Sequence, residues 1–171
     1  LTKTAFLDNE SQLKTCLEEN FFEDFVLNDN LYSLSDCKKY LKGKYVYVEL
    51  PFVFRSLNKQ YFDLLLEKIE KDEYVKGVYI NQYDVYHYLQ NRGFSKEIRS
   101  DINIYSYNSL SADFNSDLFD GFLSGSELAI NDVLNTKKYN TEIFVYGKTP
   151  LMHTANCVNK TCNKCTKYTK K

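Results

Sequence analysis

The chain has 171 residues, a length that suits one domain, and its formal net charge of −1 excludes a strong overall attraction to nucleic acid or to a membrane surface. Hydrophobic residues make up 43% and charged residues 26% of the sequence, which is ordinary for a globular protein in water. No apolar run approaches the ~20 residues that span a bilayer, and no secretory signal is present, so we expect no membrane contact and a reducing, cytoplasmic location. The chain opens with Leu1 rather than methionine. We therefore expect a piece of a larger polypeptide whose remaining segments complete the fold.

In the first hundred residues, short β-type runs alternate with helical patterns. Strands are predicted at 4–7, 24–27, 45–50 and 77–80. One helix is predicted from a cap at Asp8 or Asn9 through about Glu19, and a second from a cap at Ser33 or Ser35 to a stop at Gly43. A third is predicted from Asn58 onward, and a fourth over 83–90 with a stop at Gly93. In the helix from Asn58, the residues expected along one side are Tyr61, Leu64, Leu65, Lys68 and Ile69, and the apolar members are expected to face the core.

The pattern continues after residue 100. Strands are predicted at 101–105, 119–123 and 142–146, a helix is predicted to start at 109–114, and another is predicted from a cap at Ser126 through Leu134. Strands spaced in this way, with helices between them, indicate parallel pairing and an α/β fold. Two architectures fit, a doubly wound open sheet or most of a β/α barrel. A full barrel usually needs about 250 residues, so the barrel would be partial and TIM-barrel-like.

The segment after Pro150 has a different character. We expect residues 1–150 to form the α/β barrel-like part and residues 151–171 to form a cysteine- and lysine-rich loop or tail that is poorly ordered by itself. No G-x-G-x-x-G or Walker A sequence occurs, so nucleotide binding has no support.

Three cysteines near the end of the chain, Cys157, Cys162 and Cys165, have the spacing C-x4-C-x2-C. Thiolates select iron–sulfur clusters and zinc, and such centres usually have four ligands. The sequence therefore predicts an iron–sulfur cluster in the intact protein, with zinc as the alternative, and an empty site in this piece. Clustered thiols favour ligation over a single nucleophilic cysteine. Cys16 and Cys37 lie among leucines on predicted helices, and we expect them to be small buried hydrophobic residues.

Three further residues are candidates for a catalytic role. Glu127 follows a predicted strand and opens a predicted helix, so it could hold substrate or transfer a proton, or it could be a first-turn glutamate favoured by the helix dipole. Asn108 could contact substrate or cap a helix. His153, four residues before Cys157, could be a ligand, a proton carrier or a surface residue. The lysines of the tail could meet RNA phosphates or simply be solvated.

The order of motifs from residue 101 onward resembles a known family. Asp-Ile-Asn-Ile-Tyr-Ser-Tyr-Asn-Ser at 101–109 is followed by Gly-Phe-Leu-Ser-Gly-Ser-Glu-Leu at 121–128, by Glu-Ile-Phe-Val-Tyr-Gly-Lys-Thr-Pro-Leu-Met at 142–152, and then by the cysteines. Together these resemble the U-32 peptidase family, the collagenase-like peptidases. The resemblance covers roughly residues 101–165. Before residue 101, only the βα rhythm and the helix start at 10–13 agree.

The resemblance implies a β/α-barrel catalytic domain, and an iron–sulfur cluster held by the cysteines in several members. Three hypotheses follow for the whole protein. The first is a collagenase-like protease acting on peptides. The second is an iron–sulfur-dependent hydroxylation factor acting on RNA or a small aromatic molecule. The third is a non-catalytic binding domain. In each case we expect the isolated piece to be inactive.

Overall fold

The computed structural model describes residues 2–33, 41, 43–135, 140–149 and 153. Cys37, Cys157, Cys162 and Cys165 lie outside the described residues, and of the predicted tail 151–171 only His153 lies within them. The predictions made for those four cysteines and for the order of the tail are therefore not tested by the structure.

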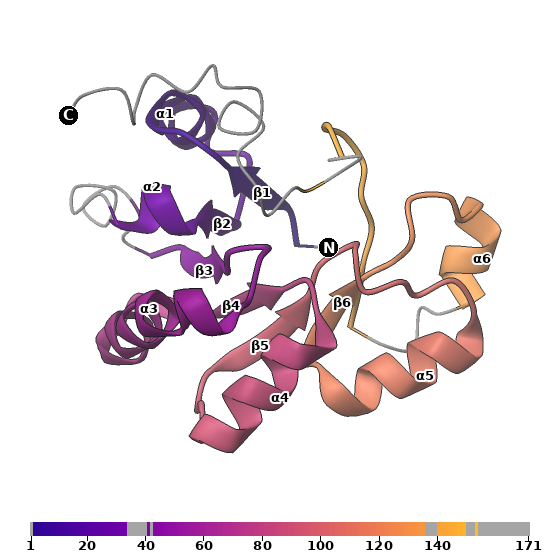
Figure 1. The fold of residues 1–171 in the computed structure, drawn as a ribbon. Coiled ribbons are helices and arrows are strands. Elements are labelled where there is room, and N and C mark those ends of the chain that lie inside the picture. Colours follow the sequence, from indigo (N-terminus) through magenta and orange to yellow (C-terminus); the bar gives the residue numbers. More distant parts are fainter. Residues whose placement is uncertain (1, 34–40, 42, 136–139, 150–152, 154–171) are drawn as a thin grey trace, which may run out of the picture.

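A curled parallel sheet of seven strands forms the centre of the molecule (Figure 1). The strands are β1 (Thr4–Leu7), β2 (Asp24–Asn28), β3 (Tyr45–Glu49), β4 (Val75–Ile80), β5 (Glu97–Ser100), β6 (Gly121–Leu123) and β7 (Thr141–Glu142). Their order in the sheet is their order in the sequence, and every neighbouring pair is parallel. A doubly wound sheet would reverse its strand order at a switch point, so the alternative of a partial, TIM-barrel-like half-barrel is the correct one.

Helices connect the strands and lie on the outside of the curl (Figure 1). They are α1 (Glu10–Glu19), α2 (Asp29–Ser33), α3 (Lys59–Lys71), α4 (Tyr83–Arg92), α5 (Ser109–Leu118) and α6 (Ile130–Asn135), with a 3-10 turn η2 (Ser56–Asn58) before α3. Within the described ranges, no helix combines the length and the apolar character needed to cross a membrane.

The alternation of side chains along each strand separates an outer core from an inner face. On β3, Val46 and Val48 point outward and join the main hydrophobic core with residues of the surrounding helices, Leu66 and Leu89 among them. Cys16 packs against this core, as expected, but it is only half-buried. The inner face holds a smaller apolar cluster, which consists of Val26, Tyr47, Tyr79 and Leu123 with Ile102 and Phe144 packed against it.

The fifth strand is not where the sequence predicted it. Residues 101–105 are irregular, and the strand is Glu97–Ser100, immediately before them. Glu97 and Arg99 point into the curl, where they pair with other charged groups, so this strand carries no apolar alternation. A strand with charges on its inner face resembles a polar loop when it is seen as sequence alone.

Helix α3 buries a face that overlaps the predicted one, since Leu65 and Ile69 are buried as predicted but Leu64 is not. Phe62 and Leu66 are fully buried together with Leu65 and Ile69, whereas Tyr61 is 44% exposed and Leu64 is 61% exposed. The period of the pattern was correct, but the stripe had to be centred one residue later.

Two other boundaries also differ from the predictions, and one predicted helix is not tested. The helix predicted from Ser33 or Ser35 to Gly43 falls mostly on residues that are not described, and the described helix α2, which lies before it at Asp29–Ser33, was not predicted. The helix predicted from Ser126 begins at Ile130, so Glu127 lies in a turn ahead of α6 and does not open the helix. The predicted strand 142–146 pairs only at its start.

Candidate active site at the carboxyl ends of the strands

Polar side chains stand at the carboxyl end of five neighbouring strands. Asp8 follows β1, Asn28 ends β2, Glu49 ends β3, Asn81 follows β4, and Asp101 follows β5. The carboxyl ends of parallel strands meet at one edge of the sheet, and in β/α barrels this edge carries the active site. We call this set of residues, together with Asp29 and His153, the mouth.

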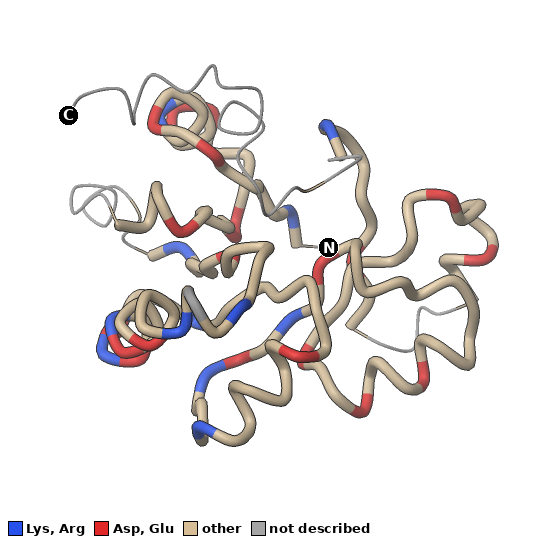
Figure 2. The backbone as a smooth tube through the Cα atoms, in the orientation of Figure 1, with Lys and Arg blue, Asp and Glu red and all other residues tan. Residues whose placement is uncertain are grey.

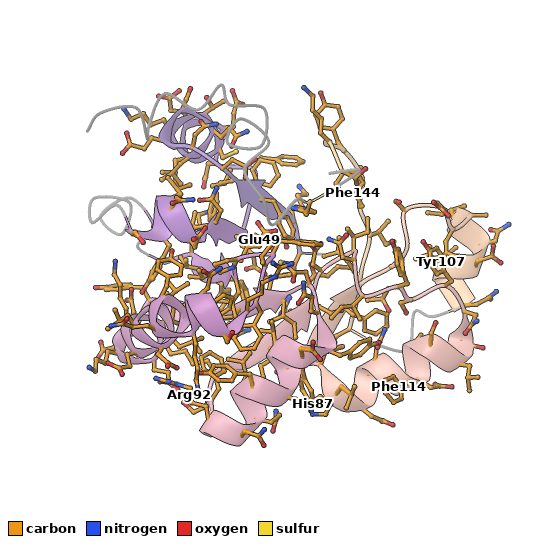
Figure 3. The ribbon with its side chains drawn as sticks, viewed as in Figure 1. Glu49, His87, Arg92, Tyr107, Phe114 and Phe144 are labelled. Atoms are coloured by element: carbon orange, nitrogen blue, oxygen red, sulfur yellow. The ribbon has the colours of Figure 1, made fainter. Side chains whose placement is uncertain are left out.

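Glu49 is the central carboxylate of the mouth and lies near the middle of the curled sheet in Figure 3. Burial raises the pKa of its carboxyl group to about 7, and the negative charges of Asp101, Asp8 and Asp29 act in the same direction. A carboxyl group with this pKa is present in both protonation states at neutral pH. It can therefore accept a proton and return it, as a general base and acid must.

Asp101 stands beside this group and is held in place by its own loop. It is 9% exposed, and its two carboxylate oxygens accept hydrogen bonds from the backbone N–H of Ile102 and from Nδ2 of Asn103, the latter at 2.6 Å. Burial raises its pKa, whereas these two hydrogen bonds and the nearby His153 lower it. The His153 ring stacks on Phe52, with centroids 3.5 Å apart. Phe52 belongs to the loop after β3, so His153 lies at the mouth.

Asn81 carries a buried amide at the same edge. The residue is 6% exposed, and its Oδ1 has no hydrogen-bond partner. Glu49 is in register with Tyr79, and Ile80 is in register with Ser100. The backbone N–H of Asp101 donates to the carbonyl of Ile80 at 2.7 Å, which continues the parallel pairing beyond the strands. Asn81 therefore stands two residues beyond Tyr79, on the inner face and on the strand between those of Glu49 and Asp101.

Asn28 connects the ends of the first two strands. Its Oδ1 accepts from the backbone N–H of Leu31 at 2.8 Å and so caps the short helix α2, while its Nδ2 donates to the carbonyl of Asp8 at 3.3 Å. Asp29, the next residue, accepts a hydrogen bond from the Tyr61 hydroxyl at 2.6 Å. These contacts fix the acidic side of the mouth to the scaffold.

A network of paired charges lies inside the curl, on the floor of the mouth. Arg99 donates to Glu142 at 2.6 Å and to Glu97 at 3.2 Å. The hydroxyl of Tyr79 lies 2.6 Å from Glu142, and the hydroxyl of Tyr47 lies 2.8 Å from Glu97. Because each charge is matched by an opposite charge or a hydroxyl donor, the network is a rigid base for the groups above it.

Of the three catalytic candidates from the sequence, only His153 lies at the mouth, where it acts on Asp101 and stacks on Phe52. Asn108 caps α5: its Oδ1 accepts from the backbone N–H of Ser111 at 2.8 Å, and the Ser111 hydroxyl accepts from the Asn108 N–H. Glu127 is exposed, and its charge acts on Tyr107. In Figure 3, Tyr107 lies on the α6 side of the molecule, well away from Glu49.

The predicted metal ligands Cys157, Cys162 and Cys165 lie outside the described residues. Within the described part of the chain, no three side chains of histidine, cysteine, aspartate or glutamate converge closely enough to hold a metal ion. The proposal of a cluster therefore rests on the chemistry of the cysteines, not on their geometry.

Glu49, Asn81 and Asp101 were not predicted to be site residues. Each is a polar residue at or directly after the end of a strand, following Tyr-Val-Tyr-Val, Val-Tyr-Ile and Glu-Ile-Arg-Ser respectively. Such a position would have identified Glu49 and Asn81, whose strands were predicted. Asp101 could not be identified in this way, because the sequence predicted a strand at 101–105 and so put Asp101 at the start of a strand, not after its end.

A scan against protein-family models found no match for this sequence, and a search of curated proteins found none either.

Proposed function

We propose that this chain belongs to a U-32-family β/α-barrel enzyme that hydrolyses peptides at the mouth of the half-barrel. The observation that carries the proposal is Glu49, a partly buried carboxyl group with a pKa near 7 at the carboxyl ends of parallel strands. The curled parallel sheet agrees with the barrel that the resemblance implies. The motifs at 101–109, 121–128 and 142–152 supply the family assignment.

Hydrolysis of a peptide bond requires a proton to leave the attacking water and a proton to reach the departing nitrogen. In the proposed reaction, the Glu49 carboxylate takes the proton from water as the water oxygen bonds to the peptide carbonyl carbon. The protonated Glu49 then gives that proton to the nitrogen as the carbon–nitrogen bond breaks. Asp101 and His153 position the reacting groups, and one side chain serves both steps because its pKa lies near neutrality.

The test is cleavage of a peptide library by the natural protein that contains this chain, in the presence of a metal chelator. We expect Glu49→Gln to lower the cleavage rate by about a hundredfold or more, since the loss of a general base has an effect of this order. Glu127→Gln is the matched control, because it removes an exposed carboxylate outside the mouth. Equal rates for the wild type and Glu49→Gln would exclude Glu49 as the base.

A second candidate function is favoured by the position of His153. This residue comes four positions before Cys157 in the sequence and stacks on Phe52 at the mouth. If Cys157, Cys162 and Cys165 hold an iron–sulfur cluster, the cluster would supply electron transfer for hydroxylation of RNA or a small aromatic molecule. Zinc remains the alternative metal.

The two functions give different results in one preparation. Iron and acid-labile sulfide in protein purified without oxygen, lost in Cys162→Ser and retained in Cys16→Ser, would support the cluster-dependent enzyme. Zinc without sulfide would indicate a structural centre. Partner binding without metal and without cleavage would leave the third hypothesis, a binding domain.

A further inference from the structure

The charges of the mouth are strongly unbalanced. Asp8, Asp29 and Asp101 are the charged neighbours that act on Glu49, and all three carry the same sign as its own carboxylate. Arg99, on the floor, is paired with two glutamates. His153 lowers the pKa of Asp101, and its ring stacks on Phe52.

Asn81 provides an independent observation. Its side chain is more than nine-tenths buried, on the inner face and on the strand between those of Glu49 and Asp101, and its Oδ1 accepts no hydrogen bond. A buried acceptor without a donor costs about 1–3 kcal/mol, so such a group usually has a function. A donor placed beside Asp101 would meet this oxygen as well as the carboxylate.

We propose that the mouth binds a cationic side chain of the substrate, the guanidinium of an arginine or the ammonium of a lysine, with Asp101 and Asn81 as its acceptors. The nearby Glu49 carboxylate adds to the attraction through its charge without a direct bond, so its carboxyl group stays free to transfer the proton. This inference rests on the proposed peptidase function and names the peptides that the enzyme takes. Guanidinium has five N–H donors in one plane, so it can reach acceptors on several strands at once.

The spacing of the acidic groups favours an extended organic cation over a metal ion. A metal requires several ligands within one coordination sphere, and no three acidic, histidine or cysteine groups in the described ranges meet this condition. Charge elsewhere agrees with a cationic substrate. From residue 103 to 135 every charged side chain is acidic, namely Asp113, Asp117, Asp120, Glu127 and Asp132. In Figure 2, the described residues of α5, of α6 and of the turn before α6 include acidic residues but no Lys or Arg. The same charges repel the phosphates of RNA.

The test compares two ligands that differ in charge but hardly in shape. N-acetyl-arginine amide and its neutral ureido isostere N-acetyl-citrulline amide are titrated into the full chain by calorimetry in low salt, near pH 8. We expect the arginine compound to bind at least about tenfold more tightly. Glu49→Gln and Asn81→Ala should each reduce this preference severalfold, and Glu127→Gln should leave it unchanged.

Equal affinity for the two compounds, no binding of either, or an unchanged preference in Glu49→Gln would overturn the inference. Tighter binding of a short RNA than of the arginine compound would overturn it too. The comparison of the two compounds with the wild type needs no variant, so it decides the question even if Glu49→Gln does not fold.

Failure of the inference is distinguishable from failure of the proposed function. If peptides with arginine and with citrulline are cleaved equally fast, the peptidase remains and the cation site is wrong. If the arginine compound binds preferentially but no peptide is cleaved, the cation site remains and the peptidase is wrong.

Discussion

Glu49 makes a prediction about stability that does not depend on knowing the substrate. Its pKa rises from the ordinary 4.5 to about 7 in the folded protein. Between these two values the folded state holds a proton that the unfolded state has released. The unfolding free energy is therefore highest below the unfolded-state pKa, decreases as the pH rises toward 7, and is constant above it. At about 1.4 kcal/mol per pKa unit, the decrease between about pH 5 and pH 8 amounts to about 2.5 kcal/mol.

Glu49→Gln keeps the shape of the side chain and removes its charge, so the variant should lack this decrease. We expect it to be more stable than the wild type by about 2–3 kcal/mol near pH 8 and by less than about 1 kcal/mol near pH 5. Urea unfolding followed by circular dichroism at both pH values measures the difference. Asp24 also has a raised pKa, but it is not among the charges that act on Glu49 and cancels in the comparison. Asp101 acts on Glu49, so relief of its repulsion is part of the expected gain in the variant. Parallel pH dependences for the two proteins would show that Glu49 is not buried among like charges.

Three further substitutions test the scaffold, each by urea unfolding. Arg99→Met leaves two inward glutamates without their shared partner and should lower the unfolding free energy by about 3 kcal/mol, whereas no loss would mean that the network is not formed. Gly77→Ala places a Cβ against the backbone of Glu97 and should lower the unfolding free energy by about 1–3 kcal/mol. An unchanged unfolding free energy would contradict the pairing of β4 with β5. Leu66→Ala should lower the unfolding free energy by about 3 kcal/mol because Leu66 is fully buried, whereas Leu64→Ala should change it by less than about 0.5 kcal/mol. A large loss for Leu64→Ala and a small one for Leu66→Ala would show that α3 buries the face predicted from the sequence.

The sequence was sufficient for the fold because most strands of a β/α barrel bury their outer face and carry continuous apolar runs. Tyr45–Glu49 and Val75–Ile80 were found almost to the residue. Local capping chemistry was equally readable: Asn9 accepts from the backbone N–H of Gln12 at 3.0 Å and begins α1, and Gly93 ends α4 with a φ of +73°. The strand at 97–100 was missed because its inward charges are satisfied only by residues distant in sequence, such as Glu142.

The site was harder to predict than the fold, for a related reason. Asn108 and Glu127 were chosen because a polar residue next to a helix start is visible in one stretch of sequence, and such residues are more often caps or surface groups. The importance of Glu49 depends on Asp8, Asp29 and Asp101, which come from three other loops. Only the register of the strands brings these carboxyl groups near one another. His153 was identified from its distance to the cysteines, and its stacking on Phe52 could not have been read from that distance.

The sequential strand order has a consequence for biosynthesis. Each strand hydrogen-bonds to the one made just before it, so no strand waits for a distant part of the chain to be translated. The sheet can therefore form during synthesis. The βαβ unit of β1, α1 and β2 forms first, and each later strand then joins the strand made just before it while the polypeptide leaves the ribosome. Growth in this direction adds each new strand at one edge, so that within the described sheet the edges at every stage are β1 and the newest strand, and the backbone groups open to wrong partners do not increase as the sheet grows.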